Sequence, residues 1–417
     1  MRFISLSADK VNFIKNFFSL SIVQGLNYLL PLITLPYLVR ILGAEKFGIL
    51  SLATAVVAFL VVFTDYGFNY TATREISLNK NNTEELIKIF SSVMIIKFIL
   101  LFISLLILLV LLVTVSKFNQ NYVVYLLTFG VVLGQVLFPV WFFQGIEKMK
   151  FITAVNVFSK TLAAVCIFIF IKKADDYYWV PILTSLGSIL GGLYSLILVK
   201  REFGIIIKLQ PFYEIIKHLK GGWHLSLTSF ISTLLTSSGI LILGFFASNH
   251  IVGLYAAIEK LFKAIIGMFL PITQALYPIS CKYFNKNDND GGRYLIRLFV
   301  IMLLCSTVVA FLVAFNSSFI ILNFYGSNLL RYSYILQIMM IWLVFSVVNN
   351  VIGIQYLCAR KKDKFYTLAF IISGLITVLL NLALIPRIGI NGILYATIFG
   401  EIILTLAMLI FIRGKKL

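Results

Sequence analysis

Charged residues are scarce in this chain of 417 residues. They make up 12% of the sequence, whereas a soluble domain carries roughly 25%. Hydrophobic residues make up 60%, and the mean hydropathy is +1.00. So little polar surface cannot cover a globule in water, so the apolar side chains must face lipid. The composition therefore argues against a soluble enzyme and indicates an integral membrane protein.

Cysteine, histidine and the common catalytic motifs are also rare or absent. The four cysteines have no C-x-x-C or metal-ligand spacing, and the three histidines form no motif. The sequence has no G-x-x-x-x-G-K-[ST] loop, no H-E-x-x-H and no G-x-S-x-G. We therefore expect no enzyme, no bound metal and no cofactor.

Long apolar runs dominate what remains, and a bilayer-spanning helix needs about 20 such residues. The predicted spans are 16–38, 47–68, 90–115, 121–143, 151–171, 178–199, 222–247, 252–277, 294–315, 330–357, 365–386 and 390–412. The first run carries Pro31 and Pro36 and lacks a small-residue cleavage site, so it is predicted to be an uncleaved span. The expected fold is an all-α integral membrane protein of about 12 transmembrane helices in two six-helix lobes around a central cavity.

Acidic residues are outnumbered, with 16 Asp and Glu against 35 Lys and Arg. On a soluble protein this excess would suggest nucleic acid, but in a membrane protein basic residues gather in cytoplasmic loops. If the N-terminus is cytoplasmic, 24 of the 35 basic residues fall in cytoplasmic segments and 7 in external ones. We therefore expect both termini in the cytoplasm and no nucleic-acid partner.

The longest cytoplasmic connection, residues 200–221, is predicted to divide the chain into an N-terminal lobe, 1–199, and a C-terminal lobe, 222–417. Apolar residues recur in it at spacings of three and four from Phe212 to Leu219. This pattern predicts a short amphipathic helix on the inner membrane face.

The two halves show faint self-similarity. Phe47–Leu52 opens the second predicted span, and Val252–Ala257, with glycine in the same place, opens the eighth. A parallel repeat of this kind is typical of many secondary transporters.

Ionisable residues inside the predicted spans are the candidates for function. Each costs roughly 2.5–3.5 kcal/mol at the centre of a helix, so each is expected to face the bundle interior or a wet cavity. They are Asp65, Lys97, Lys160, Glu259, Lys260, Lys263 and Glu401. Their mid-membrane excess is cationic, which suits a substrate that bears phosphate or acidic sugar. The predicted substrate-binding residues are Lys97, Lys160, Lys260, Lys263 and, from the first span, Gln24 and Asn27.

Ion pairing is the alternative role for the same residues. Glu259 and Lys263 are four apart and can pair along one helix face. Asp65 is expected to pair with Arg74 or Lys97, and Glu401 could neutralise a lysine from another helix. Because a buried carboxylate can titrate near neutral pH, the three acidic residues Asp65, Glu259 and Glu401 are also candidates to bind a coupling ion.

Five stretches in order along the chain resemble a known family. They are Leu30–Gly43 with Phe47–Gly48, Asp65–Phe68 with Arg74–Ile76, Trp141–Met149, Gly253–Lys260 with Pro271 and Gln274–Pro278, and Gly389–Gly392 leading to Glu401. Together they resemble the polysaccharide exporters of the multidrug/oligosaccharidyl-lipid/polysaccharide (MOP) superfamily, specifically Wzx-type O-antigen flippases.

The resemblance implies a flippase in the bacterial inner membrane. It would move undecaprenyl-pyrophosphate-linked oligosaccharide from the cytoplasmic to the periplasmic leaflet by alternating access, coupled to a proton or sodium gradient. The polymerase and chain-length regulator of the same pathway are its expected partners. The cargo could serve O-antigen, capsule, common antigen or teichuronic acid.

Two other functions are compatible with a membrane chain of this kind. A drug/cation antiporter of the same superfamily would need an acidic or neutral cavity, and the lysine excess counts against it. A membrane polymerase would need catalytic residues on a sizeable external loop, and the predicted external loops are short.

Overall fold

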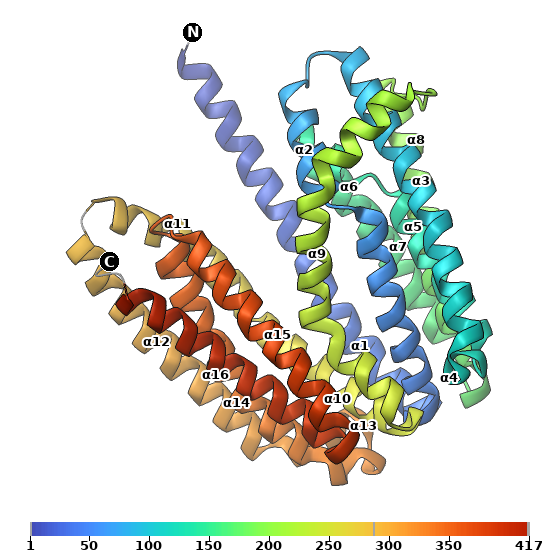
Figure 1. Cartoon of the computed structure of the whole chain (residues 1–417), viewed down its shortest axis with the longest axis vertical. Helices are drawn as coiled ribbons and strands as arrows, with labels where there is room; N and C mark the ends of the chain where they lie inside the picture. The colour runs from blue at the N-terminus through green and yellow to red at the C-terminus, as the bar shows by residue number, and fades with distance from the viewer. Residues whose placement is uncertain (1, 287, 415–417) are drawn as a thin grey trace. The chain divides into compact units, whose positions relative to one another are not determined.

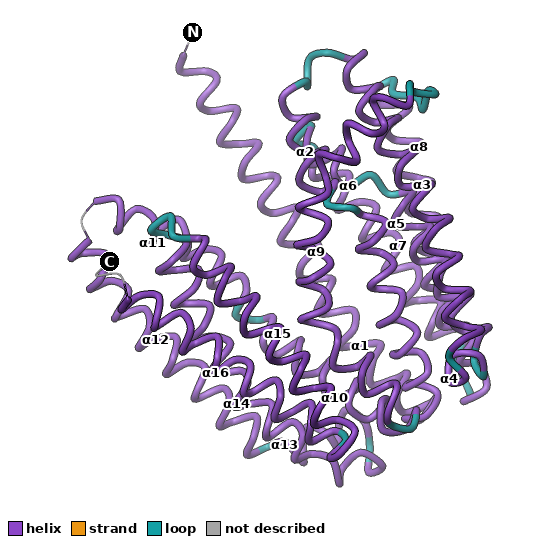
Figure 2. The backbone as a smooth tube through the Cα atoms, in the orientation of Figure 1, coloured by secondary structure: helices purple, strands orange, loops and turns teal. Residues whose placement is uncertain are grey.

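The computed structural model describes residues 2–286 and 288–414, and Figures 1 and 2 show helices joined by short loops throughout this part. Within these ranges there is no β-strand. The side chains that lie outside the described part are those of residues 2–24, 26–29, 235–236, 275, 286, 288–289 and 414.

The chain begins with a long helix, α1 (Arg2–Asp65), that contains two predicted spans. Gly43 interrupts it with φ 71° and ψ 168°, a backbone conformation that residues with a Cβ rarely adopt. The helical parts on either side, 2–42 and 44–65, correspond to the predicted spans 16–38 and 47–68.

The remaining helices of the first half pack tightly along one another. They are α2 (Phe68–Leu78), α3 (Thr83–Thr114), α4 (Ser116–Asn119), α5 (Tyr122–Leu137), α6 (Val140–Gly145), α7 (Met149–Phe170), the 3₁₀ helix η1 (Ala174–Tyr178) and α8 (Trp179–Phe203). Helix α8 lies against both α5 and α7. The C-terminus of α8 is capped by Gly204 in the left-handed conformation. The basic residues Lys200 and Arg201 in its last turn interact favourably with the helix dipole.

The second half continues the same pattern. Its helices are α9 (Phe212–Phe246), α10 (Asn249–Gly267), α11 (Leu270–Lys286), α12 (Asp288–Phe315), α13 (Ser317–Tyr325), the 3₁₀ helix η2 (Ser327–Tyr332), α14 (Ser333–Asn350), the π-helix η3 (Val351–Cys358), α15 (Asp363–Ile388) and α16 (Ile390–Gly414). Helix α16 packs beside α14 and α15.

Nine helices of the described part are long and apolar enough to cross a membrane, and the two parts of α9 together make a tenth. The difference from twelve has two sources. The segment Leu30–Leu78 passes as a single candidate although Gly43 breaks it. The predicted span 252–277 is divided between α10 and α11, and its three charged residues lower its hydropathy.

The helices form two compact units. Unit 1 contains Met1–Thr34 and Ile49–Leu234, and unit 2 contains Leu35–Gly48 and Leu235–Leu417. A short piece of the first half therefore belongs to the second unit. The division of the chain at residues 200–221 remains a prediction.

Aromatic packing fills the core of unit 1. Trp141, Phe142 and Phe143 of α6 are fully buried, and Phe142 packs edge-to-face on Phe90 and Phe203. Large buried rings of this kind contribute much of the packing energy of a core. This part of the stretch Trp141–Met149 therefore serves the fold.

The self-similar stretches noted in the sequence meet each other in unit 2. A Cβ on Gly48 would collide with the backbone of Asn249, and a Cβ on Gly253 would collide with the backbone of Ala44. Each glycine thus lies against the residue four positions before the other, and α1 and α10 cross backbone to backbone. Only glycine permits so close an approach.

We therefore expect Gly48→Ala and Gly253→Ala each to destabilise the protein, because overpacking of this kind costs about 1–3 kcal/mol. The unfolding temperature of the purified protein in detergent should fall by several degrees. The matched control is Gly221→Ala in α9, where no atom lies within 4 Å of the added methyl group. Unchanged unfolding of both variants would contradict the crossing.

Candidate functional site

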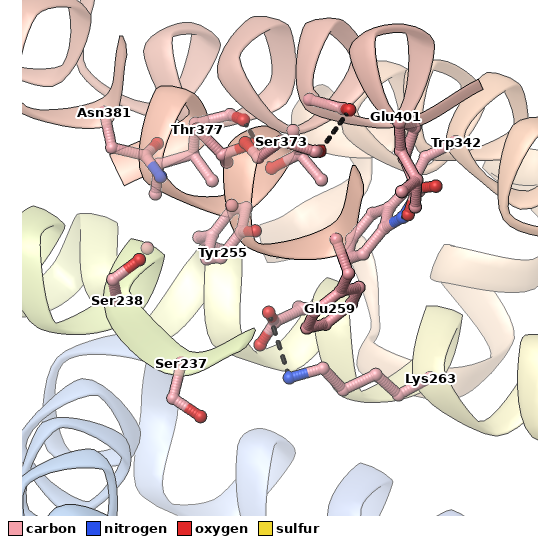
Figure 3. A pocket seen from close by; sticks show the side chains of 17 residues that line it. Ser237, Ser238, Tyr255, Glu259, Lys263, Trp342, Ser373, Thr377, Asn381 and Glu401 are labelled. Carbon is pink, nitrogen blue, oxygen red and sulfur yellow. Dashed lines mark hydrogen bonds and ion pairs between the residues drawn. The ribbon is translucent and has the colours of Figure 1, made fainter. Parts of the chain in front are cut away.

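Unit 2 encloses a cavity of about 290 Å³ between α9, α10, α14, α15 and α16. Its wall includes two carboxylates, Glu259 and Glu401, and the polar side chains of Thr377, Asn381 and Thr397. Figure 3 shows Glu259 and Glu401 on different helices on either side of the cavity. We call this space the unit 2 cavity.

Glu401 is held by neutral hydrogen-bond donors. Trp342 donates through Nε1 to Oε1 at 2.9 Å, and Asn349 donates through Nδ2 to Oε2 at 2.6 Å. Thr405 in turn donates to Oδ1 of Asn349 at 2.7 Å, which fixes the amide orientation. Within the described residues, no lysine or arginine forms an ion pair with Glu401. The carboxylate therefore keeps its negative charge uncompensated or takes up a cation or proton.

Glu259 has a cationic partner. Its side chain is buried, and Oε1 lies 3.1 Å from Nζ of Lys263, one turn further along α10. In Figure 3 the dashed line between Glu259 and Lys263 marks this ion pair. The pairing expected from the four-residue spacing is present, so the charge of Glu259 is balanced where that of Glu401 is not.

The rest of the wall presents hydrogen-bond acceptors. Thr377 and Thr397 each donate their hydroxyl hydrogen to a backbone carbonyl one turn earlier, both at 2.8 Å. Their oxygen lone pairs remain for the cavity. In the described part of the chain, Oδ1 of Asn381 and Oγ of Ser238 are buried without a hydrogen-bond partner. The oxygen atoms on this otherwise largely apolar wall suit a hard cation or a proton-carrying water.

Unit 1 encloses a second cavity, of about 280 Å³, between α5, α7 and α8. Lys160 and Asn156 of α7, Gln135 of α5 and Ser188 of α8 line it. None of the described residues on its wall is acidic. The two cavities therefore differ in charge: the unit 1 cavity holds the ammonium group of Lys160, and the unit 2 cavity holds two carboxylates beside Lys263.

Lys97, predicted to bind substrate, lies in an ion pair with Asp65. Its side chain is 2% exposed, and Nζ lies 2.9 Å from Oδ1 of Asp65 and 3.4 Å from the carbonyl of Gln135. A lysine can be buried among helices only when its charge is balanced in this way. The structure favours the ion-pair alternative for both Lys97 and Asp65, and their roles in substrate binding and ion coupling remain predictions.

Three other predicted substrate residues have different surroundings within their own units. Lys260 lies over the ring of the buried Phe47, 4.8 Å from its centroid, so an aromatic face stabilises its charge. Lys160 is on the unit 1 cavity and Lys263 on the unit 2 cavity. Gln24 and Asn27 belong to α1, and their side chains lie outside the described part.

Trp342, Asn349 and Asn381 were not predicted from the sequence. Asn349 and Asn381 are buried polar residues within apolar runs, which is the signal that could have singled them out. Nothing in the sequence connects Trp342 with Glu401, because the two lie 59 positions apart on different helices.

A multi-span helical protein with charged groups on cavities inside its helix bundles is by class a polytopic integral membrane protein. An inward-facing multidrug resistance MATE family transporter of the MOP superfamily has the same fold, with a TM-score of 0.75 at 15% identity over 94% of this chain and 96% of that one. The lipid II flippase MurJ, inward closed, gives 0.71 at 16% identity over 96% of this chain and 87% of its own. The all-α fold of about twelve transmembrane helices in two lobes is thereby confirmed.

Sequence comparison then gives the family. Residues 13–284 match the family described as polysaccharide biosynthesis protein, and the chain belongs to it. It is 28% identical over 412 residues to the "Putative O-antigen transporter" of Escherichia coli (strain K12), covering 99% of each chain. A protein of the same name from Shigella dysenteriae is 27% identical over 396 residues, covering 95% of this chain and 98% of that one. The polysaccharide family expected from the sequence is confirmed, and both relatives carry the name of a transporter.

Proposed function

We propose that this chain is a flippase for undecaprenyl-pyrophosphate-linked O-antigen repeat units. It moves them from the cytoplasmic to the periplasmic leaflet of a bacterial inner membrane, with both termini in the cytoplasm. The likeness to two O-antigen transporters over nearly the whole chain supports the cargo. The likeness of fold to a lipid II flippase supports a lipid-linked glycan crossing between leaflets.

Coupling to an ion gradient belongs to the same proposal, and Glu401 carries it. Its carboxylate has neutral partners, faces an oxygen-lined cavity and lies in the middle of a spanning helix. Entry of a sodium ion or proton neutralises this charge. It thereby changes the free-energy difference between conformations in which the surroundings of the Glu401 carboxylate on α16 differ. Alternating access of the two lobes then uses the energy of the gradient.

The unit 1 cavity supplies the positive charge that an anionic cargo needs. Lys160 is the only lysine on its wall, among neutral polar groups. An ammonium group there binds a phosphate or an acidic sugar by a charge-assisted hydrogen bond.

We therefore expect Lys160→Met to lower transport about tenfold or more, because a hydrogen bond to a charged group contributes about 1.5–3 kcal/mol. The readout is surface polysaccharide in a complemented deletion strain, normalised to membrane abundance. Lys150→Met is the matched control, on the same helix but exposed outside the cavity. Equal transport by the two variants would remove Lys160 from the cargo site.

The leaflet on which cargo accumulates tests the proposed function itself. A deletion strain should accumulate lipid-linked single repeat units on the cytoplasmic leaflet. Accumulation on the periplasmic leaflet would point to a polymerase. A raised sensitivity to cationic drugs with normal polysaccharide would point to a drug antiporter.

A further inference from the structure

The connection between α8 and α9 exposes large apolar side chains at one end of unit 1. Leu209 is 96% exposed, Phe212 is 74% exposed and Tyr213 is 73% exposed. Ile206 and Ile207, just before them, are exposed as well. A contiguous apolar surface of this kind is unfavourable in water and marks a contact surface.

The backbone of this connection is held against unit 1. Ile205 is buried in the same core as Trp141. The backbone N–H of Lys208 donates to Oγ of Ser91 on α3 at 3.0 Å. Because these anchors fix the inner side, Ile206, Ile207 and Leu209 are left facing outward.

The first turns of α9 are anchored in the same way. Ile215 and Leu219 pack against the unit 1 core, and the buried His218 lies with Nδ1 3.0 Å from Oε2 of Glu75. The amphipathic helix on the inner membrane face stays a prediction, and two of its apolar residues, Ile215 and Leu219, are taken up by the core of unit 1. Phe212 and Tyr213, in the first turn of α9, are large apolar side chains that remain exposed.

Basic residues surround the exposed apolar ones. Lys200 and Arg201 end α8, and Lys208, Lys217 and Lys220 follow, all exposed. The acidic residues of the segment are Glu202 and Glu214, and Glu214 pairs with Lys217 at 3.3 Å. The segment therefore carries a net positive charge.

The position of this surface along the spanning helices indicates what covers it. Helix α8 is one of the candidate membrane spans and ends at Phe203, a few residues before the exposed group begins. We therefore expect this segment to lie at the level of the lipid headgroups. Apolar side chains enter the acyl boundary there, while lysine side chains extend to the phosphates.

We propose that the surface formed by residues 206–220 binds the anionic phospholipid headgroups of the adjacent leaflet. Lys208, Lys217 and Lys220 contact the phosphates, and Leu209, Phe212 and Tyr213 enter the acyl boundary. By the predicted topology this is the cytoplasmic leaflet. The surface thereby holds the start of α9, the helix through which the chain passes from unit 1 to unit 2 at Leu234.

Trp223, exposed one turn beyond Leu219, is a native reporter of this surface. The purified full chain is reconstituted in vesicles of phosphatidylcholine that contain a minor fraction of brominated phosphatidylglycerol, or the same fraction of brominated phosphatidylcholine. Bromine quenches tryptophan at close range, and the difference between wild type and Trp223→Phe isolates the Trp223 signal. We expect phosphatidylglycerol to quench Trp223 more strongly than phosphatidylcholine at equal fraction.

Neutralising the lysines should remove this preference. Lys208→Gln, Lys217→Gln and Lys220→Gln should each lower it about fivefold, which corresponds to about 1 kcal/mol for a basic residue near an anionic surface. The matched control is Lys172→Gln with Lys173→Gln, on the connection between α7 and α8.

Three results would overturn the proposal. The first is equal quenching of wild-type Trp223 by the two brominated lipids. The second is an unchanged preference after the three lysine substitutions. The third is protection of Trp223 from both lipids, which would mean that a protein covers the surface.

Discussion

Replacing Glu401 with glutamine should reduce transport by about a hundredfold or more while leaving the protein in the membrane. The substitution keeps the shape of the side chain and removes the charge that the unit 2 cavity presents to a cation. Two neutral donors, Trp342 and Asn349, hold the carboxylate. Each 1.36 kcal/mol corresponds to a tenfold change in rate. Loss of about 3 kcal/mol of interaction with the coupling ion therefore corresponds to a reduction of about a hundredfold.

Surface polysaccharide in the complemented deletion strain is the readout for Glu401→Gln, with membrane abundance measured in parallel. Glu84→Gln, an exposed substitution in the first turn of α3, is the matched control. Glu401→Asp keeps the charge and should retain part of the activity. Full activity of Glu401→Gln would show that the carboxylate does not bind the coupling ion.

Replacing Lys97 with methionine should destabilise unit 1 by about 3–5 kcal/mol, because it leaves Asp65 without its partner. The ammonium group is 2.9 Å from the carboxylate and is enclosed by helices. The measurement is thermal or denaturant unfolding of the purified protein. The double variant Lys97→Met with Asp65→Asn removes both charges and should recover most of the stability.

The same double variant separates the two roles considered for Lys97. If the lysine is a partner of Asp65 only, the double variant should be stable and should transport. A stable double variant that does not transport would make the lysine or the aspartate part of the transport site. Equal stability of the single variant and the wild type would contradict the ion pair.

Hydropathy was sufficient to predict most of the spans, since these are long apolar runs with few charges inside them. All twelve predicted segments are helical apart from short breaks, such as Tyr66–Gly67 and Phe138–Pro139. The segment 252–277 is the least regular, because it carries Glu259, Lys260 and Lys263 and divides at Met268. A local signal, read over about 20 residues, is enough for elements of this length.

Pairings between helices could be predicted only in part. Asp65 was expected to pair with Arg74 or Lys97, and the structure pairs it with Lys97, 32 positions away. Trp342, 59 positions from Glu401, was not expected as its partner. The helix faces that meet decide between such partners, and one sequence does not contain that information. The association of Leu35–Gly48 with unit 2 was not predictable for the same reason. It depends on a contact between distant helices, that of Gly48 with α10.

The most direct test of ion-driven flipping is a transport assay with purified protein. Proteoliposomes are loaded with the undecaprenyl-pyrophosphate-linked repeat unit of the native strain, and its arrival in the opposite leaflet is followed under an imposed proton or sodium gradient. We predict that one of these gradients accelerates flipping by the wild type and that Glu401→Gln abolishes the acceleration. Flipping that is absent in the wild type, or equally fast with and without either gradient, would contradict the proposed function.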